Sequence, residues 1–192
     1  MIRLHDIETL GRFQRAKTAI GLRKAARATV DLQRELPYPA QGYGNPRRGY
    51  KRLGRIAATA ESHGLKAFTI MENAPARRRL QAIGMATAQA SVPRPNPTEM
   101  RHGIELSYWH SSSVLQDFGS QVMDLLMAKV EAGAVSGSEA NASLWMVTLP
   151  NHLRKASICE AVGMIAVEIP QVYHIDDGVT EPRQLWVLGK SA

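Results

Sequence analysis

The sequence predicts an α/β fold in which helices flank a β-sheet, preceded by a basic and mostly helical N-terminal region. Between residues 103 and 190, strand-like and helix-like hydrophobic patterns alternate in the order β-α-β-α-β-β. Such alternation favours helices packed on a sheet, and the last two strands are expected to pair as a hairpin. The length of 192 residues suits one generous domain or two small ones.

The first half of the chain is expected to be mainly helical. Asp6 is placed to cap a first helix. A second helix is expected over 22–36, where Pro37 ends it. A loop rich in Gly and Pro follows over 37–49, and a third helix is expected over 50–62.

An internal echo links the two halves of the sequence. A strand over 66–71 and a helix over 76–83, closed by Gly84 as a C-cap, are expected in the first half. The segment 65–90 that contains them resembles 142–169, since both read strand, Asn, helix, Gly-Met, strand. This echo suggests a tandem, degenerate repeat.

A proline-rich connector separates the two halves. Residues 91–98 carry three prolines, which exclude a helix or a central strand. We therefore place a domain boundary there, with a basic N-terminal region at 1–95 and an α/β core at 96–192. The core elements are expected in this order: a strand over 103–109, a helix over 115–130, a strand over 144–149, a helix over 153–162, and strands over 165–169 and 184–188.

Charge is divided unequally between the halves. Residues 1–101 hold 19 Lys and Arg against 7 Asp and Glu, whereas residues 102–192 hold 5 against 10. The first half is thus suited to an anion such as nucleic acid, a phosphate-bearing cofactor or an acidic partner. The competing interpretation is that the halves neutralise each other across their own interface.

Composition excludes several classes of protein. There is no apolar run of about 18 residues, so we expect no membrane segment, and no signal-peptide pattern is present. A single cysteine, Cys159, excludes an internal disulfide and a cysteine-rich metal site, and no metal ligand set is expected. We expect a cytoplasmic protein, or a virion protein if it is phage-encoded.

Two Asn-led segments resemble a known family. NAPARRRLQAIGM (73–85) and NHLRKASICEAVGM (151–164) each place an Asn at the start of an expected helix that ends in Gly-Met. This arrangement resembles the GNAT superfamily of N-acetyltransferases. The resemblance is good across about 85 residues at the C-terminal end and weaker across residues 48–90. The resemblance implies a GNAT-like mixed sheet, acetyl-CoA as cofactor, and transfer of an acetyl group to the amine of a small molecule or protein.

The resemblance also implies a place for the cofactor. The family holds the pyrophosphate of acyl-CoA on a turn whose small residues let backbone N–H groups approach the phosphates at a helix N-terminus. Here Gln116 and Gly119 match the turn, and the expected cofactor-binding residues are these two, Ser120 beside them and Asn151 at the start of the Asn-led helix. A capping box formed by Ser113 and Gln116 is the competing explanation, and it needs no ligand.

The expected catalytic groups lie on the strand before that turn and on the Asn-led helix. In the family a carboxylate takes a proton from the amine, and a Tyr often protonates the thiolate. Glu105 is placed like the carboxylate, and Cys159 stands where the family has its Tyr. Tyr108 and His110 are alternative acid–base groups, and packing in the core is the competing role for Cys159.

Cations of the first half form a second candidate site, for nucleic acid or phosphate. Few aromatic residues interleave with them, so any nucleic-acid binding would be blind to sequence. The cations are Arg47, Arg48, Lys51, Arg52, Arg77, Arg78 and Arg79.

Two alternatives to an enzyme remain. One is a catalytically silent GNAT-like structural protein, such as a phage virion or neck component in a homo-oligomer or virion assembly. The other is a nonspecific nucleic-acid-binding protein.

Overall fold

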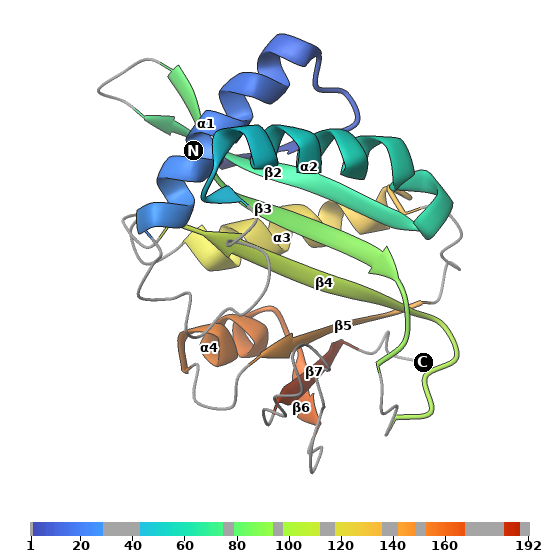
Figure 1. Cartoon of the computed structure of the whole chain (residues 1–192). Helices are drawn as coiled ribbons and strands as arrows, with labels where there is room; N and C mark the ends of the chain where they lie inside the picture. The colour runs from blue at the N-terminus through green and yellow to red at the C-terminus, as the bar shows by residue number, and fades with distance from the viewer. Residues whose placement is uncertain are drawn as a thin grey trace.

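In the part of the chain that the structure describes, seven strands form one mixed sheet (Figure 1). The computed structural model describes residues 2–28, 43–74, 79–93, 98–111, 118–135, 142–148, 153–167 and 183–188. Only β4 and β5 pair in parallel; every other neighbouring pair is antiparallel. In sheet order the strands are β1 (Ile2–Asp6), β2 (Leu65–Ala74), β3 (Arg79–Ala90), β4 (Gly103–His110), β5 (Ser143–Thr148), β7 (Gln184–Leu188) and β6 (Ile165–Val167).

Helices cover both faces of this sheet, which confirms the predicted α/β fold. Helices α1 (Arg12–Ala28) and α2 (Pro46–Thr59) pack over one face, and their core includes Trp109 of β4. Helices α3 (Phe118–Glu131) and α4 (Leu153–Ala161) pack over the other face (Figure 1). A short 3-10 helix, η3 (Glu61–His63), leads into β2.

The C-terminal elements follow the predicted order. The apolar stripe of α3 is buried, as its helical spacing predicts. Helix α4 is followed by Gly163, whose φ of 81° is the left-handed conformation that glycine adopts at little cost. Strands β6 and β7 form the expected antiparallel pair.

The N-terminal elements differ from the prediction in several places. Residues 12–28 form one helix, α1, where two helices were predicted with the second beginning at 22; the remainder of that second helix, 29–36, lies outside the described residues. Residues 2–6 form a strand, because they add to the edge of the sheet beside β2. Asp6 does not cap a helix; its side chain accepts a hydrogen bond from the Glu8 N–H in a turn, and α1 begins only at Arg12. Helix α2 begins at Pro46 rather than at 50, because the Asn45 side chain caps it.

The predicted helix over 76–83 was wrong, since residues 79–90 form β3. Alanines favour a helix in isolation, but small side chains also fit a strand that is covered on both faces. Ala82 packs against Gly21 of α1 on one face of the sheet, and Ala86 packs in the core beneath α3 and α4 on the other face. Gly84 is not a C-cap: a Cβ there would lie 2.0 Å from the Trp109 carbonyl oxygen. The first segment of the echo is therefore a β2–β3 hairpin and not a repeat of strand, helix, strand.

The sheet continues across the proline-rich connector. Residues 84–90 of β3 pair with residues 104–110 of β4, so strands on both sides of the proposed boundary share one sheet. This pairing places the end of β4 at the centre of the sheet, between the two helical layers.

Candidate active site at the ends of β4 and β5

Strands β4 and β5 separate at their carboxyl ends. Their parallel pairing joins Gly103–Glu105 to Ser143–Trp145 and stops there, although both strands are described beyond that point. The backbone groups that follow lack the β4–β5 ladder. We call this region, Leu106–His110 of β4 with Met146–Thr148 of β5, the β4/β5 fork.

Two helices begin at the open end of the β4/β5 fork. Helix α3 follows β4 along the chain and α4 follows β5, so their amino ends lie at the same edge of the sheet (Figure 1). Unpaired N–H groups and the helix dipole make such ends favourable to negative charge. The fork therefore combines open strand edges with helix ends suited to an anion.

Tyr108 and His110 form a stacked pair on the α3/α4 face of β4. Their ring centroids are 6.1 Å apart with an interplanar angle of 8°. His110 Nδ1 lies 3.0 Å from the Ser111 carbonyl oxygen, which accepts only, so this nitrogen carries the proton. Burial lowers the pKa of His110; the Ser111 hydrogen bond opposes this effect, and Arg154 and Lys155 add to it. The imidazole is thus held neutral near pH 7 with Nε2 as its acceptor.

Lys155 extends from the first turn of α4 to β4. Its Nζ donates to the Tyr108 carbonyl oxygen at 3.4 Å and lies 5.2 Å from the centroid of the Tyr108 ring. Burial lowers the pKa of Lys155 to about 8, while Cys159 opposes this effect and Arg183 reinforces it. The sequence analysis did not identify this residue, although its spacing of four from Cys159 places both on one face of α4.

Cys159 lies in the core beside the fork. Its side chain is fully buried, and Sγ lies 3.4 Å from the Met146 Sδ. Burial raises the pKa of the Cys159 thiol to about 12, and burial followed by the charge of Cys159 raises the pKa of Tyr108. The structure brings these two predicted catalytic residues together, but both hold their protons tightly.

Glu105 is separated from that pair. Residues alternate along β4, so Glu105 lies on the α1/α2 face, opposite to Tyr108. Its Oε2 accepts a hydrogen bond from Ser91 Oγ at 3.3 Å, and the Trp145 indole N–H donates to the Ser91 carbonyl oxygen at 2.8 Å. Glu105 thus lies at the closed end of the fork.

The residues predicted to bind the cofactor are described only in part. Gly119 and Ser120 lie in the first turn of α3, whereas Gln116 and Asn151 are outside the described residues. A Cβ at Gly119 would lie 2.3 Å from Ile158 Cδ1, so the close packing of α3 on α4 is itself a reason for this glycine. Among the described residues, no group of three or more His, Cys, Asp or Glu is arranged to hold a metal.

The predicted cationic site is partly visible on α2. Arg47, Arg48, Lys51 and Arg55 are exposed, and their spacing places them along one side of the helix. The guanidinium of Arg52 lies 5.3 Å from the centroid of the Tyr43 ring. Arg77 and Arg78 are outside the described residues, and Arg79 begins β3.

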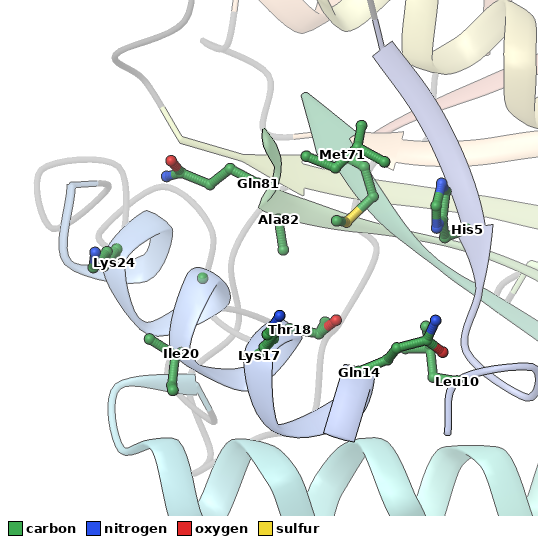
Figure 2. Close-up of a pocket in the computed structure, with 12 residues that line it drawn as sticks. His5, Leu10, Gln14, Lys17, Thr18, Ile20, Lys24, Met71, Gln81 and Ala82 are labelled. Atoms are coloured by element: carbon green, nitrogen blue, oxygen red, sulfur yellow. The ribbon is translucent and has the colours of Figure 1, made fainter. Parts of the chain in front are cut away.

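A separate pocket of about 730 Å³ lies between α1 and the strands β1, β2 and β3 (Figure 2). Two lysines, Lys17 and Lys24, stand on its α1 side, and His5, Met71 and Gln81 stand on its strand side. No residue of the β4/β5 fork lines it. It is therefore distinct from the candidate active site.

Comparison with known proteins identifies the fold. RimL, a ribosomal L7/L12 α-N-protein acetyltransferase in complex with coenzyme A, aligns at a TM-score of 0.69 and 12% identity over 98% of this chain and 93% of that chain. The ribosomal-protein-S5-alanine acetyltransferase from Vibrio fischeri aligns at 0.68 and 13% over 98% and 91%. The microcin C7 self immunity acetyltransferase MccE, in complex with acetyl-CoA and AMP, aligns at 0.69 and 8% over 98% and 92%.

These neighbours are GNAT acetyltransferases, and the likeness shows that this chain has the GNAT fold over nearly its whole length. No protein-family profile matches the sequence, and no curated protein matches it significantly. No described helix is both long and apolar enough to span a membrane.

Proposed function

We propose that this protein is an acetyl-CoA-dependent N-acetyltransferase that binds its cofactor at the β4/β5 fork. The observation that carries the proposal is the end of the β4–β5 pairing at Glu105 and Trp145, inside a GNAT fold. Neighbours of this fold have been solved with coenzyme A or acetyl-CoA. Acceptors named for them include ribosomal proteins, so the acceptor class proposed here is an amine of a protein or small molecule.

The fork suits an extended chain that carries amide groups. Beyond Glu105, the open edge of β4 offers backbone donors and acceptors, and an extended ligand pairs with such an edge as an added strand does. The phosphates of the cofactor would then lie toward the amino end of α3, near Gly119 and Ser120, where the helix dipole favours negative charge.

Two bases are available to the acceptor amine, one on each face of β4. Glu105 serves an amine that approaches from the α1/α2 face, and His110 serves one that approaches from the α3/α4 face. Replacement by Gln keeps the shape of Glu105, replaces the His110 ring by a polar amide, and in both cases removes the function as a base. The route in use is the one whose variant, Glu105→Gln or His110→Gln, lowers kcat by about 100-fold or more.

Calorimetry with acetyl-CoA tests cofactor binding. We expect the wild-type chain to bind, and Ser120→Glu to weaken binding about tenfold or more, because a carboxylate in the first turn of α3 repels the phosphates. Ala128→Glu is the matched control, since it adds the same charge at an exposed position of the same helix, two turns away. No heat at millimolar acetyl-CoA would remove the enzyme hypothesis.

A thiol-release assay with a panel of amines and peptides tests turnover. Release of coenzyme A that depends on the acceptor supports the proposal. Binding of acetyl-CoA without turnover by any acceptor would instead favour the catalytically silent, structural alternative.

Nucleic-acid binding is the second candidate function, because α2 exposes Arg47, Arg48, Lys51 and Arg55 along one side. Each phosphate contact contributes about 0.9 to the slope of log K against log salt concentration. Changing these four residues to Gln should lower the slope for duplex DNA by up to about four. The matched control neutralises four exposed cations of α1, namely Arg12, Lys17, Lys24 and Arg27. An equal decrease of the slope in both variants would refute a specific role for α2.

A further inference from the structure

The ammonium group of Lys155, which belongs to α4, reaches the β4/β5 fork. Lys155 starts from α4, beside the end of β5, and its Nζ reaches the carbonyl oxygen and the ring face of Tyr108 on β4. This contact joins α4 to β4 in the region where the β4–β5 pairing has stopped. A thioester bound at the fork would place its reacting carbon and sulfur close to this group.

The surroundings of Lys155 favour release of its proton. Tyr108 and His110 face it from β4, Arg154, Cys159 and Glu160 stand on its own helix, and Arg183 approaches from the start of β7. Burial comes first among the causes that lower the pKa of Lys155 to about 8. Thiols have an ordinary pKa near 8.5, and proton transfer is most efficient between groups of similar pKa.

The other proton donors at the fork are less suitable. Burial raises the pKa of the Cys159 thiol to about 12 and also raises that of Tyr108. Both groups are therefore weaker acids than a leaving thiol. Cys159 stands where the resemblance implies the acid, and Lys155 lies one helical turn before it on the same face of α4.

We propose that Lys155 is the catalytic acid of the acetyl transfer, donating a proton from its ammonium group to the leaving sulfur. The assignment depends on the proposed acetyl-CoA-dependent function. As the acceptor nitrogen attacks the thioester carbonyl, a C–N bond forms and the C–S bond breaks. The sulfur keeps the electron pair of that bond and takes a proton from Nζ, which leaves a neutral thiol and a neutral lysine. The proton lost by the acceptor amine restores the ammonium through solvent.

Two variants of Lys155 test the role. Lys155→Met removes the proton and the charge but keeps the length, whereas Lys155→Arg keeps the charge in a group that does not release its proton. We expect kcat to fall about 100-fold in both variants, while the affinity for acetyl-CoA measured by calorimetry changes little. In the wild type, kcat should fall as pH rises through about 8, and this fall should vanish in Lys155→Arg. Lys129→Met removes an exposed cation of α3 and serves as the control.

The outcomes separate the two proposals. If the wild type shows no acetyl transfer to any acceptor, the proposed function fails and the Lys155 assignment fails with it. If the wild type is active and folded Lys155→Met stays within about threefold of its kcat, only the Lys155 assignment is overturned. Loss of acetyl-CoA affinity at constant kcat would also overturn it, because that result describes a binding residue. Full activity of Lys155→Arg with an unchanged pH profile would also overturn the assignment, because the positive charge alone, without proton donation, would then account for the role of Lys155.

Discussion

Replacing Gly84 by Ala tests the central correction to the predicted fold. As the C-cap of a helix, Gly84 would tolerate Ala at a cost of about 1–2 kcal/mol, the cost of a left-handed backbone. In the structure Gly84 lies within β3, opposite His110, and its Cβ position is occupied by the backbone of β4. The two placements predict different losses of stability.

The expected loss follows from the distances. An added Cβ would lie 2.0 Å from the Trp109 carbonyl oxygen, 2.6 Å from His110 Cα and 2.9 Å from His110 Cβ. The nearest two atoms belong to the backbone, so no rotation of a side chain relieves the overlap, and β3 must move away from β4. Overpacking of this kind costs about 3 kcal/mol or more, and weakened ladder hydrogen bonds add to it. For a chain of this size, that loss lowers the Tm by roughly 6–12 °C.

Urea unfolding measures the effect, with two glycines as controls. Gly54→Ala lies inside α2, where the nearest atom is the far end of the Arg15 side chain at 3.2 Å, so we expect a change between zero and a gain of about 1 kcal/mol. Gly163→Ala, with a φ of 81°, should cost about 1–2 kcal/mol. If Gly84→Ala costs no more than Gly163→Ala, the strand assignment of residues 79–90 is refuted.

Four further outcomes are expected. Thr148→Val should cost about 1–3 kcal/mol in urea unfolding, because the buried Trp186 indole N–H loses its acceptor at 3.0 Å, and Trp186→Phe in the same chain should recover part of this loss. The Cys159 thiol should react with a thiol reagent at pH 8 only when the protein unfolds, since it is fully buried and its pKa is raised to about 12; rapid labelling of the native protein would contradict this. Lys155 has a folded pKa of about 8 and an ordinary value of 10.5, so the unfolded state binds more protons between these values; the wild type should therefore gain stability relative to Lys155→Met as pH rises through that window. Lys66→Met should cost at most about 1 kcal/mol, less in high salt, because its two ion pairs at 2.7 and 3.0 Å are partly exposed.

The C-terminal half was predictable because its local patterns and its burial agree. The apolar run that became β5 is buried on both faces, and the stripe of α3 packs on the sheet as its spacing requires. The N-terminal half was less predictable because neighbours distant in sequence decide its structure. Residues 2–6 form a strand only because β2 offers an edge, and the alanines of β3 form a strand because helices press on both of its faces.

The same division explains which parts of the candidate site the sequence revealed. Tyr108 was identified from its position at the end of a predicted strand and Cys159 from the family resemblance of the Asn-led helix, and the structure brings them together, because both positions depend on local pattern. Glu105 was identified in the same way, but a shift of three residues along a strand places it on the opposite face from Tyr108. Lys155 carries no local signal of reactivity, since a lysine in the first turn of a short helix is usually solvated. Its pKa is lowered by burial against β4 and by the charge of Arg183. Tyr108 of β4 lies 47 positions before Lys155 and Arg183 lies 28 positions after it, so only the folded chain makes Lys155 a candidate acid.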